Sequence, residues 1–112
     1  MPTAFASEAA HIHDIGHLSA ADIAWATKAD ESTVRAWIRG DRSPSGHRAE
    51  RLAEFSAIVE RAVNLMQPSY VPVWMRKPIS LLDDRKPLDL VRSGGYRQVL
   101  RALSSLEGMP VS

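Results

Sequence analysis

The strongest constraint on the fold is the regular spacing of apolar residues between positions 47 and 66. Within this stretch, apolar side chains recur at steps of three and four residues, which places them on one face of an α-helix. These residues are Leu52, Phe55, Ile58, Val59, Ala62 and Met66. Elsewhere the same periodicity dominates, and Val, Ile and Thr never alternate with polar residues over a useful stretch. The 112-residue sequence therefore predicts an all-α fold.

Turn and capping residues divide the rest of the chain into shorter helices. Ser19 and Asp30 suit N-caps, Gly40 suits a left-handed C-cap, and Pro87 suits a first helical position. We expect helical segments at residues 7–16, 20–27, 31–39, 47–66, 69–75, 78–82, 87–92 and 96–106. We expect the following residues in the core: Ile12, Ile15, Leu18, Ile23, Ala24, Thr27, Val34, Trp37, Ile38, Trp74, Leu81, Leu82, Leu88, Leu90, Val99, Leu100 and Leu103.

Composition excludes several kinds of protein. The chain has no cysteine, which excludes disulfides, thiol catalysis and cysteine-ligated metals. No apolar run approaches the 18 residues of a membrane span, and no secretory signal is recognisable, so we expect a cytoplasmic protein without a membrane partner. It also lacks a Gly-rich phosphate loop and a nucleophile elbow. We therefore expect no enzymatic activity and no cofactor.

Histidines near the N-terminus raise the question of a metal site. His13 and His17 have the i, i+4 spacing of two metal ligands on a helix, and His11 lies close by. However, Gly16 interrupts this segment, and His47 is the one further candidate downstream. Solvated or capping histidines explain the cluster better, and we expect no metal site.

A helix-turn-helix pattern lies at residues 18–40. Leu-Ser opens it, Ile-Ala follows in its first helix, Ser-Thr-Val opens the next helix, and Trp-Ile-Arg-Gly closes it. This stretch resembles the helix-turn-helix of Xre/Cro-type repressors, although Lys28 stands where such motifs usually have glycine. In that fold the second helix of the motif enters the major groove of DNA. The resemblance places these residues at the DNA: Glu31, Ser32, Thr33, Arg35 and Ala36 at base edges, and Arg39 nearer the backbone.

Charge argues against strong DNA binding by the isolated chain. Residues 1–47 carry a net charge of −2 and residues 48–112 a net charge of +3, whereas DNA affinity comes mostly from basic side chains that neutralise phosphates. In addition, Glu31 lies four residues before Arg35, which favours an internal ion pair. We expect operator DNA to bind weakly unless the chain forms a dimer or a larger assembly.

The second half carries another recognisable pattern. Trp-Met-x-x-Pro at residues 74–78, Arg-Lys-Pro-Leu-Asp-Leu-Val at residues 85–91 and Glu-Gly at residues 107–108 are its main parts. The pattern resembles the C-terminal domain of Xre/MbcA/ParS-type antitoxins, with Asp83 and Asp84 where that family often has glycines. The resemblance covers residues 15–112. It implies a helix-turn-helix region at residues 1–46 and a toxin-binding domain at residues 47–112, with a tail at residues 108–112.

The resemblance also implies a function and a partner. Antitoxins of this family bind a RES-domain toxin that degrades NAD, block its active site and often repress their own operon. Their C-terminal end approaches the NAD pocket of the toxin. The toxin-binding residues implied here are Arg85, Arg97, Arg101, Gly108, Met109, Pro110, Val111 and Ser112.

Several alternatives remain open. The chain could be a stand-alone helix-turn-helix repressor without a toxin, and its tail could be merely solvated. The basic residues Arg76, Lys77, Arg92, Arg97 and Arg101 could face an acidic toxin surface, DNA phosphates or solvent. Arg85 and Lys86 could pair with the neighbouring Asp83 and Asp84 on the surface. We expect a homodimer or a larger hetero-oligomer with the toxin.

Overall fold

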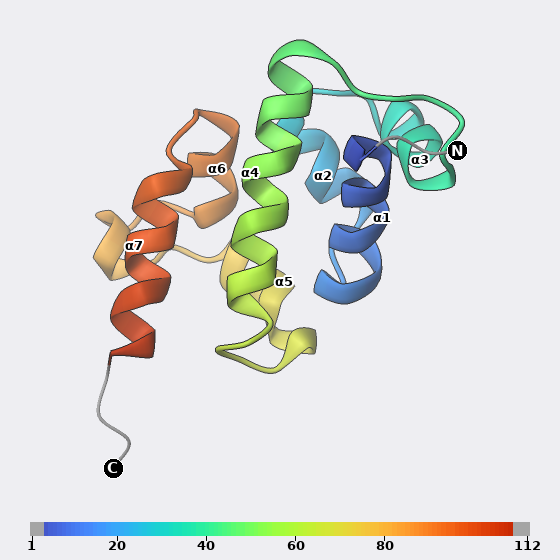
Figure 1. Cartoon of the computed structure of the whole chain (residues 1–112). Coiled ribbons are helices and arrows are strands. Elements are labelled where there is room, and N and C mark those ends of the chain that lie inside the picture. Colours follow the sequence, from blue (N-terminus) through green and yellow to red (C-terminus); the bar gives the residue numbers. More distant parts are fainter. Residues whose placement is uncertain (1–3, 109–112) are drawn as a thin grey trace.

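The computed structural model describes residues 4–108, and the side chains from residue 8 onward. This part of the chain consists of helices and turns without a β-strand, which confirms the all-α prediction (Figure 1). The helices are α1 (Ala4–Gly16), α2 (Ala20–Thr27), α3 (Glu31–Arg39), α4 (Gly46–Ala62), α5 (Val71–Arg76), α6 (Pro87–Arg92) and α7 (Tyr96–Glu107), with 3-10 turns η1 (Pro68–Tyr70) and η2 (Ser80–Leu82). None of the helices described is long and apolar enough to cross a bilayer.

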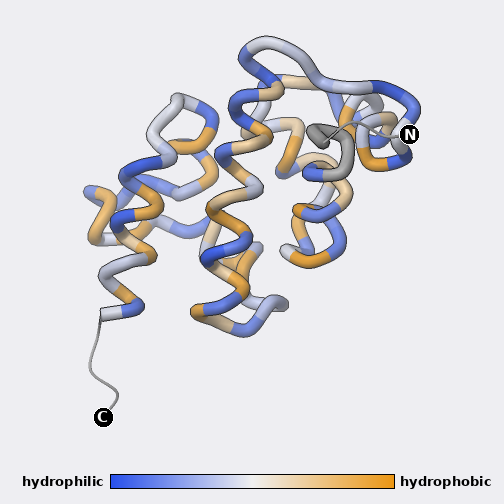
Figure 2. The backbone as a smooth tube through the Cα atoms, viewed as in Figure 1, coloured by the Kyte–Doolittle hydropathy of each residue, from blue (hydrophilic) through white to orange (hydrophobic). Residues whose placement is uncertain are grey.

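Helix α4 is the central element of the fold. It lies between the α1–α3 region on one side and α6 and α7 on the other (Figure 1). Leu52, Phe55, Ile58, Val59 and Ala62 are fully buried, as the periodicity predicted. Figure 2 shows hydrophobic and hydrophilic positions recurring along α4 and α7. One continuous cluster of buried side chains runs through residues 9–103, so the two halves of the chain share a core.

The helix ends lie at the capping residues and prolines that the sequence analysis singled out. Ser19 caps α2, Gly40 ends α3 in a left-handed conformation (φ +82°), and Pro87 opens α6. Lys28 stands where a glycine was expected, and it nevertheless adopts φ +60° as the C-cap of α2. Such backbone angles are unfavourable for a residue with a Cβ atom. The turn of the motif therefore keeps its conformation without the usual glycine.

Helix α4 ends at Ala62, four residues before the predicted end at residue 66. The amides of Leu65 and Met66 both donate to the carbonyl oxygen of Ala62, at 3.0 and 3.1 Å, and so form a tight turn. Beyond it, residues 68–76 divide into η1 and α5, where a single helix at residues 69–75 was expected. Both differences concern boundaries and leave the order of the elements unchanged.

Two residues expected in the core are exposed. Ile15 is 43% exposed, whereas Ala9, Ile12 and Gly16 are buried on the face of α1 that packs against α3 and α4. A Cβ atom at Gly16 would lie 2.8 Å from Cγ1 of Val59, which shows how close α1 and α4 are. Leu81 is 61% exposed because η2 turns it outward, while the adjacent Leu82 is buried.

Candidate functional site

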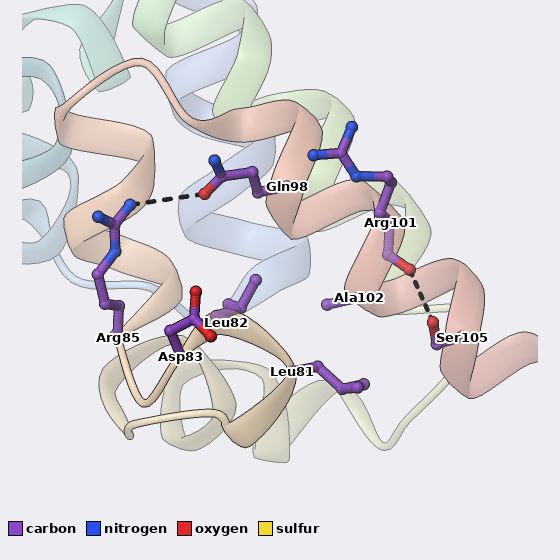
Figure 3. Close-up of a pocket in the computed structure, with 8 residues that line it drawn as sticks. All are labelled: Leu81, Leu82, Asp83, Arg85, Gln98, Arg101, Ala102 and Ser105. Carbon is purple, nitrogen blue, oxygen red and sulfur yellow. Dashed lines mark hydrogen bonds between the residues drawn. The ribbon is translucent and has the colours of Figure 1, made fainter.

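An open pocket lies between η2 and α7 (Figure 3). Its volume is about 330 Å³. The residues that line it are Leu81, Leu82, Asp83, Arg85, Gln98, Arg101, Ala102 and Ser105. Two of the three arginines implied as toxin-binding, Arg85 and Arg101, thus meet at one hollow, although 16 residues separate them in the sequence.

A tight reversal of the chain brings Arg85 to α7. Asp83 and Asp84 adopt φ +56° and +62°, the left-handed conformation that favours glycine. The chain then returns so that the amide of Ile79 donates to the carbonyl oxygen of Arg85 at 3.1 Å. From there the guanidinium of Arg85 reaches Oε1 of Gln98, at 3.5 Å (Figure 3).

Three arginines supply the positive charge of this surface. Arg97 and Arg101 lie one turn apart on α7, and both are exposed. Within residues 4–108 neither of them, nor Arg85, forms an ion pair with a carboxylate, and the expected pairs with Asp83 and Asp84 do not form. Beside these cations lies the exposed Leu81. From the sequence, Leu81 was expected in the core and was not identified as a surface residue, because it stands among other apolar residues that are buried.

Helix α7 leads from this surface to the C-terminal end of the chain. Its last turn is fixed to α4 by Arg61, whose guanidinium contacts Oε2 of Glu107 at 2.6 Å and Oγ of Ser104 at 3.0 Å. Gly108 follows in a helical conformation and is exposed. The other tail residues implied as toxin-binding, Met109, Pro110, Val111 and Ser112, lie outside the described residues.

Helix α3 carries the residues implied as DNA-facing. Glu31, Ser32, Arg35 and Arg39 are exposed, and Thr33 is half-buried. The expected ion pair forms, with Nη2 of Arg35 at 2.9 Å from Oε2 of Glu31. Nε of Arg39 likewise contacts Oδ2 of Asp41 at 2.8 Å. Both cations of this surface are thus partly neutralised by neighbouring carboxylates.

Ala36 corrects the expectation for α3. It was predicted to face the bases, but it is only 6% exposed. Its carbonyl oxygen accepts the amide of Asp41 at 2.9 Å and so helps to close the C-cap of the helix. Its methyl group therefore faces the protein rather than a ligand.

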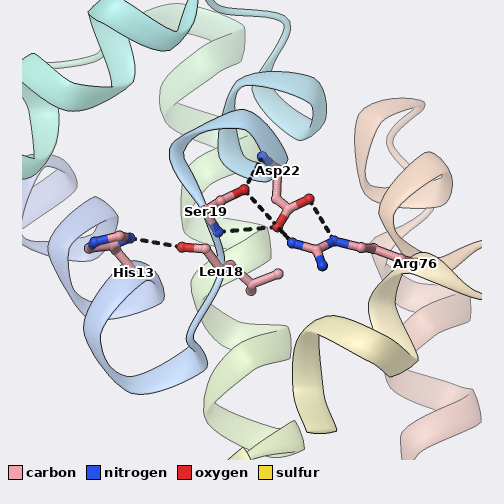
Figure 4. Close-up of polar contacts among 5 residues, drawn as sticks. All are labelled: His13, Leu18, Ser19, Asp22 and Arg76. Atoms are coloured by element: carbon pink, nitrogen blue, oxygen red, sulfur yellow. Dashed lines mark hydrogen bonds and ion pairs between the residues drawn. The ribbon is translucent and has the colours of Figure 1, made fainter. Parts of the chain in front are cut away.

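A polar cluster that the sequence did not predict joins the two halves of the chain (Figure 4). Oδ2 of Asp22 accepts the amide of Ser19 at 3.1 Å and its hydroxyl at 3.0 Å. Nε of Arg76, on α5, donates to Oδ1 of Asp22 at 3.0 Å, and a second guanidinium nitrogen contacts Oδ2. Burial raises the pKa of the Asp22 carboxyl, but the bonds from Arg76 and Ser19 outweigh this effect and hold the pKa below its usual value.

A second link joins α2 to α6. Nε1 of Trp25 donates to Oδ1 of Asp89 at 2.8 Å, and the guanidinium of Arg92 lies 4.0 Å from the centre of the indole ring. Nη1 of Arg92 also donates to the carbonyl oxygen of Trp25, at 2.7 Å. Arg76 and Arg92, which were expected to face a partner or solvent, are therefore used to hold the two halves of the chain together.

The histidines form no metal site in the part of the chain described. There, no group of three His, Cys, Asp or Glu side chains is placed to hold an ion. The ring of His13 bonds through Nδ1 to the carbonyl oxygen of Leu18 at 2.8 Å, and that of His11 lies 2.7 Å from Glu60 (Figure 4 shows the former). His17 lies beyond the helix end with φ +58°, so it does not continue the face of α1.

Known proteins are similar to this chain in sequence and in fold. Residues 70–108 match the antitoxin Xre/MbcA/ParS C-terminal toxin-binding domain. The mycobacterial cidal antitoxin MbcA of Mycobacterium tuberculosis is 32% identical over 78 residues, which cover 70% of this chain and 69% of that protein. A probable mycobacterial cidal antitoxin of the same species is 31% identical over 84 residues, which cover 75% and 71%. A chain of the crystallised M. tuberculosis MbcT–MbcA toxin–antitoxin complex matches with a TM-score of 0.85 at 28% identity, over 97% of this chain and 99% of that one.

These similarities identify the class of protein and its family. By its similarity to these antitoxins, the chain is an antitoxin of a toxin–antitoxin system. The chain belongs to the Xre/MbcA/ParS antitoxin family.

Proposed function

We propose that this antitoxin neutralises a RES-domain toxin that degrades NAD by covering the active site of the toxin. The observation that carries the proposal is the surface of η2 and α7. There, Arg85 and Arg101 line one pocket with the exposed Leu81, and Arg97 lies one turn before Arg101 on α7. The same helix leads directly into the C-terminal tail.

The chemistry of this surface suits a protein partner. Interface centres are apolar and rich in arginine, whose planar group makes several directed hydrogen bonds. Leu81 has 61% of its surface exposed, so a partner that covers it stabilises the complex by removing apolar surface from water. The surrounding guanidinium groups carry no competing internal carboxylates among the described residues, so they are available to acidic groups of the toxin.

We propose that the tail, residues 108–112, enters the NAD pocket of the toxin. Because Arg61 fixes the last turn of α7 to α4, the tail leaves from a defined point on the folded domain. Pro110 restricts the backbone, which lowers the entropic cost of ordering the tail on a partner.

Substituting the exposed leucine tests the docking surface. The chain is co-expressed with the protein encoded by the neighbouring gene, and the complex is isolated and assayed for NAD consumption. We expect Leu81→Asp to weaken the complex and release NAD-consuming activity. The matched control is Ile15→Asp, which introduces the same charge at an exposed residue of α1. Equal behaviour of the two variants would refute the role of this surface.

We also propose a second activity, binding of operator DNA through α3. The exposed Ser32 and the half-buried Thr33, at the start of this helix, support it. Because Arg35 and Arg39 are paired with acidic neighbours, the isolated chain should bind weakly, and a complex that pairs two copies should bind better. A gel shift with upstream DNA, with and without toxin, tests this. Tight binding by the antitoxin alone at physiological salt would contradict the expectation that the isolated chain binds DNA more weakly than the complex.

A further inference from the structure

A second pocket, unrelated to the toxin-facing surface, lies where the ends of α2, α4 and α6 meet. Its volume is about 450 Å³. The residues that line it are Thr27, Lys28, His47, Arg48, Arg51, Arg92 and Ser93. Four of the seven are Lys or Arg, and none is acidic. The overall net charge of +1 conceals this local concentration of positive charge.

Most of this charge is not neutralised. Arg51 pairs with Glu54 at 2.9 Å, and the ring of His47 lies 3.7 Å from Glu50. Among the described residues, however, Lys28, Arg48 and Arg92 form no ion pair with a carboxylate. Three cations that line one hollow without an anion attract a negatively charged ligand.

The contacts of the two arginines leave donors for such a ligand. Nη2 of Arg48 donates to the carbonyl oxygen of Lys28 at 3.2 Å, and Nη1 of Arg92 donates to that of Trp25 at 2.7 Å. These bonds fix the guanidinium groups against the C-terminal end of α2. Because a guanidinium has five N–H donors, each arginine retains several. Guanidinium groups that are held in place and still have free donors are well suited to the oxygens of a phosphate.

The pocket is also large enough and well placed for a phosphate that belongs to a bigger molecule. Its volume falls in the range of small-molecule sites, well above that of a single anion. Lys28 and Arg92 also line the adjoining hollow, which continues to Asp30 and Glu31 at the start of α3. A phosphate bound here would therefore lie beside the helix that carries the exposed Ser32. It would also contact both halves of the chain.

We propose that this pocket binds a phosphate group, carried either by the backbone of duplex DNA or by a small phosphorylated ligand. Lys28, Arg48 and Arg92 supply the charge, and the free N–H groups of the two arginines supply the directed hydrogen bonds. This pocket shares no lining residue with the pocket between η2 and α7.

Titration of the folded chain, followed by amide NMR, tests the proposal. One arm uses pyrophosphate and the other a short duplex DNA, both at low salt. We expect at least one of them to shift the amide signals of His47, Arg48 and Ser93 in a saturable manner, and added salt to weaken the binding. If DNA does so, the phosphate belongs to a nucleic acid; if only pyrophosphate does so, it belongs to a small ligand. If neither shifts these signals, the proposal is wrong.

Two variants separate a binding role from a structural one. Lys28→Gly removes a cation at a position whose backbone angles suit glycine, so the fold should be retained. Arg48→Gln removes a second cation from the same pocket. We expect each to weaken binding at least about tenfold, whereas the control Lys86→Gln, an exposed cation at the start of α6 that does not line this pocket, leaves it unchanged. Binding that survives both pocket variants, or that falls equally with the control, would overturn the assignment.

Discussion

Removing the carboxyl group of Asp22 should destabilise the whole domain, because this group holds the helix-turn-helix to α5. In Asp22→Ala, both Ser19 donors and two nitrogens of Arg76 lose their acceptor. A hydrogen bond to a charged group contributes about 1.5–3 kcal/mol, and removing one partner of a buried pair costs about 3–5 kcal/mol. The side chain of Arg76 is 50% exposed and can rehydrate, so the cost falls below the range for a buried pair and within that of a charged hydrogen bond. We expect a loss of about 2–3 kcal/mol in the free energy of unfolding.

Urea denaturation followed by circular dichroism measures this loss. A loss of this size corresponds to a decrease of roughly 10–20 °C in Tm for a small domain. The matched control is Asp14→Ala, since Asp14 is an exposed aspartate on α1. If Asp22→Ala lost less than about 0.5 kcal/mol, or no more than the control, the link between α2 and α5 would not be a principal support of the fold.

The pH dependence of the same group gives a second check. The pKa of Asp22 lies below its usual value in the folded state, so its folded form binds a proton less readily than the unfolded chain does. Its stabilising contribution is therefore complete above about pH 4, the usual pKa of aspartate. It should decline as the pH falls below that value toward the folded pKa. The stability difference between the wild type and Asp22→Asn should be constant from about pH 5 to 7 and shrink in acid.

Three further substitutions have expected effects on stability. Lys28→Gly should raise the free energy of unfolding by about 0.5–1 kcal/mol, because glycine adopts φ +60° without strain; an unchanged or lower urea midpoint would contradict this. Gly95→Ala should lower it by about 1–3 kcal/mol, because a Cβ atom there would lie 2.9 Å from Cδ2 of Leu90; Gly108→Ala is the control and should change little, because a Cβ atom there would lie no closer than 3.7 Å to its nearest neighbour, the carbonyl oxygen of Ser104. Trp25→Phe should cost about 0.5–1 kcal/mol through loss of the bond to Asp89, as measured by thermal unfolding; an unchanged Tm would show that the contact adds nothing.

Local signals in the sequence predicted most of the fold. Ser19, Gly40 and Pro87 mark helix ends because capping and backbone restriction act within a few residues. The Glu31–Arg35 pair was predictable for the same reason, since it depends only on helical spacing. The exposure of Ile15 and Leu81 was not predictable, because it depends on which face of each segment the neighbouring helices cover.

The contacts between the two halves lay beyond sequence reasoning. Asp22 and Arg76 are 54 residues apart, and Trp25 and Asp89 are 64 apart. No local pattern relates such residues, so the sequence indicated only their charges and aromatic character. The same holds for the surface that we propose to face the toxin: the family pattern indicated Arg85 and Arg101, whereas the pocket that joins them and the exposed Leu81 follow from the turn at Asp83 and Asp84.

The central claim is that this antitoxin silences its toxin through its C-terminal end, and one assay tests it most directly. The complex with the neighbouring gene product is isolated twice, once with the full chain and once with a chain lacking residues 108–112, and NAD consumption is measured for both. We expect both chains to co-purify with the toxin, the full-length complex to be silent and the truncated one to consume NAD. Full inhibition by the truncated chain would show that the tail does not block the active site.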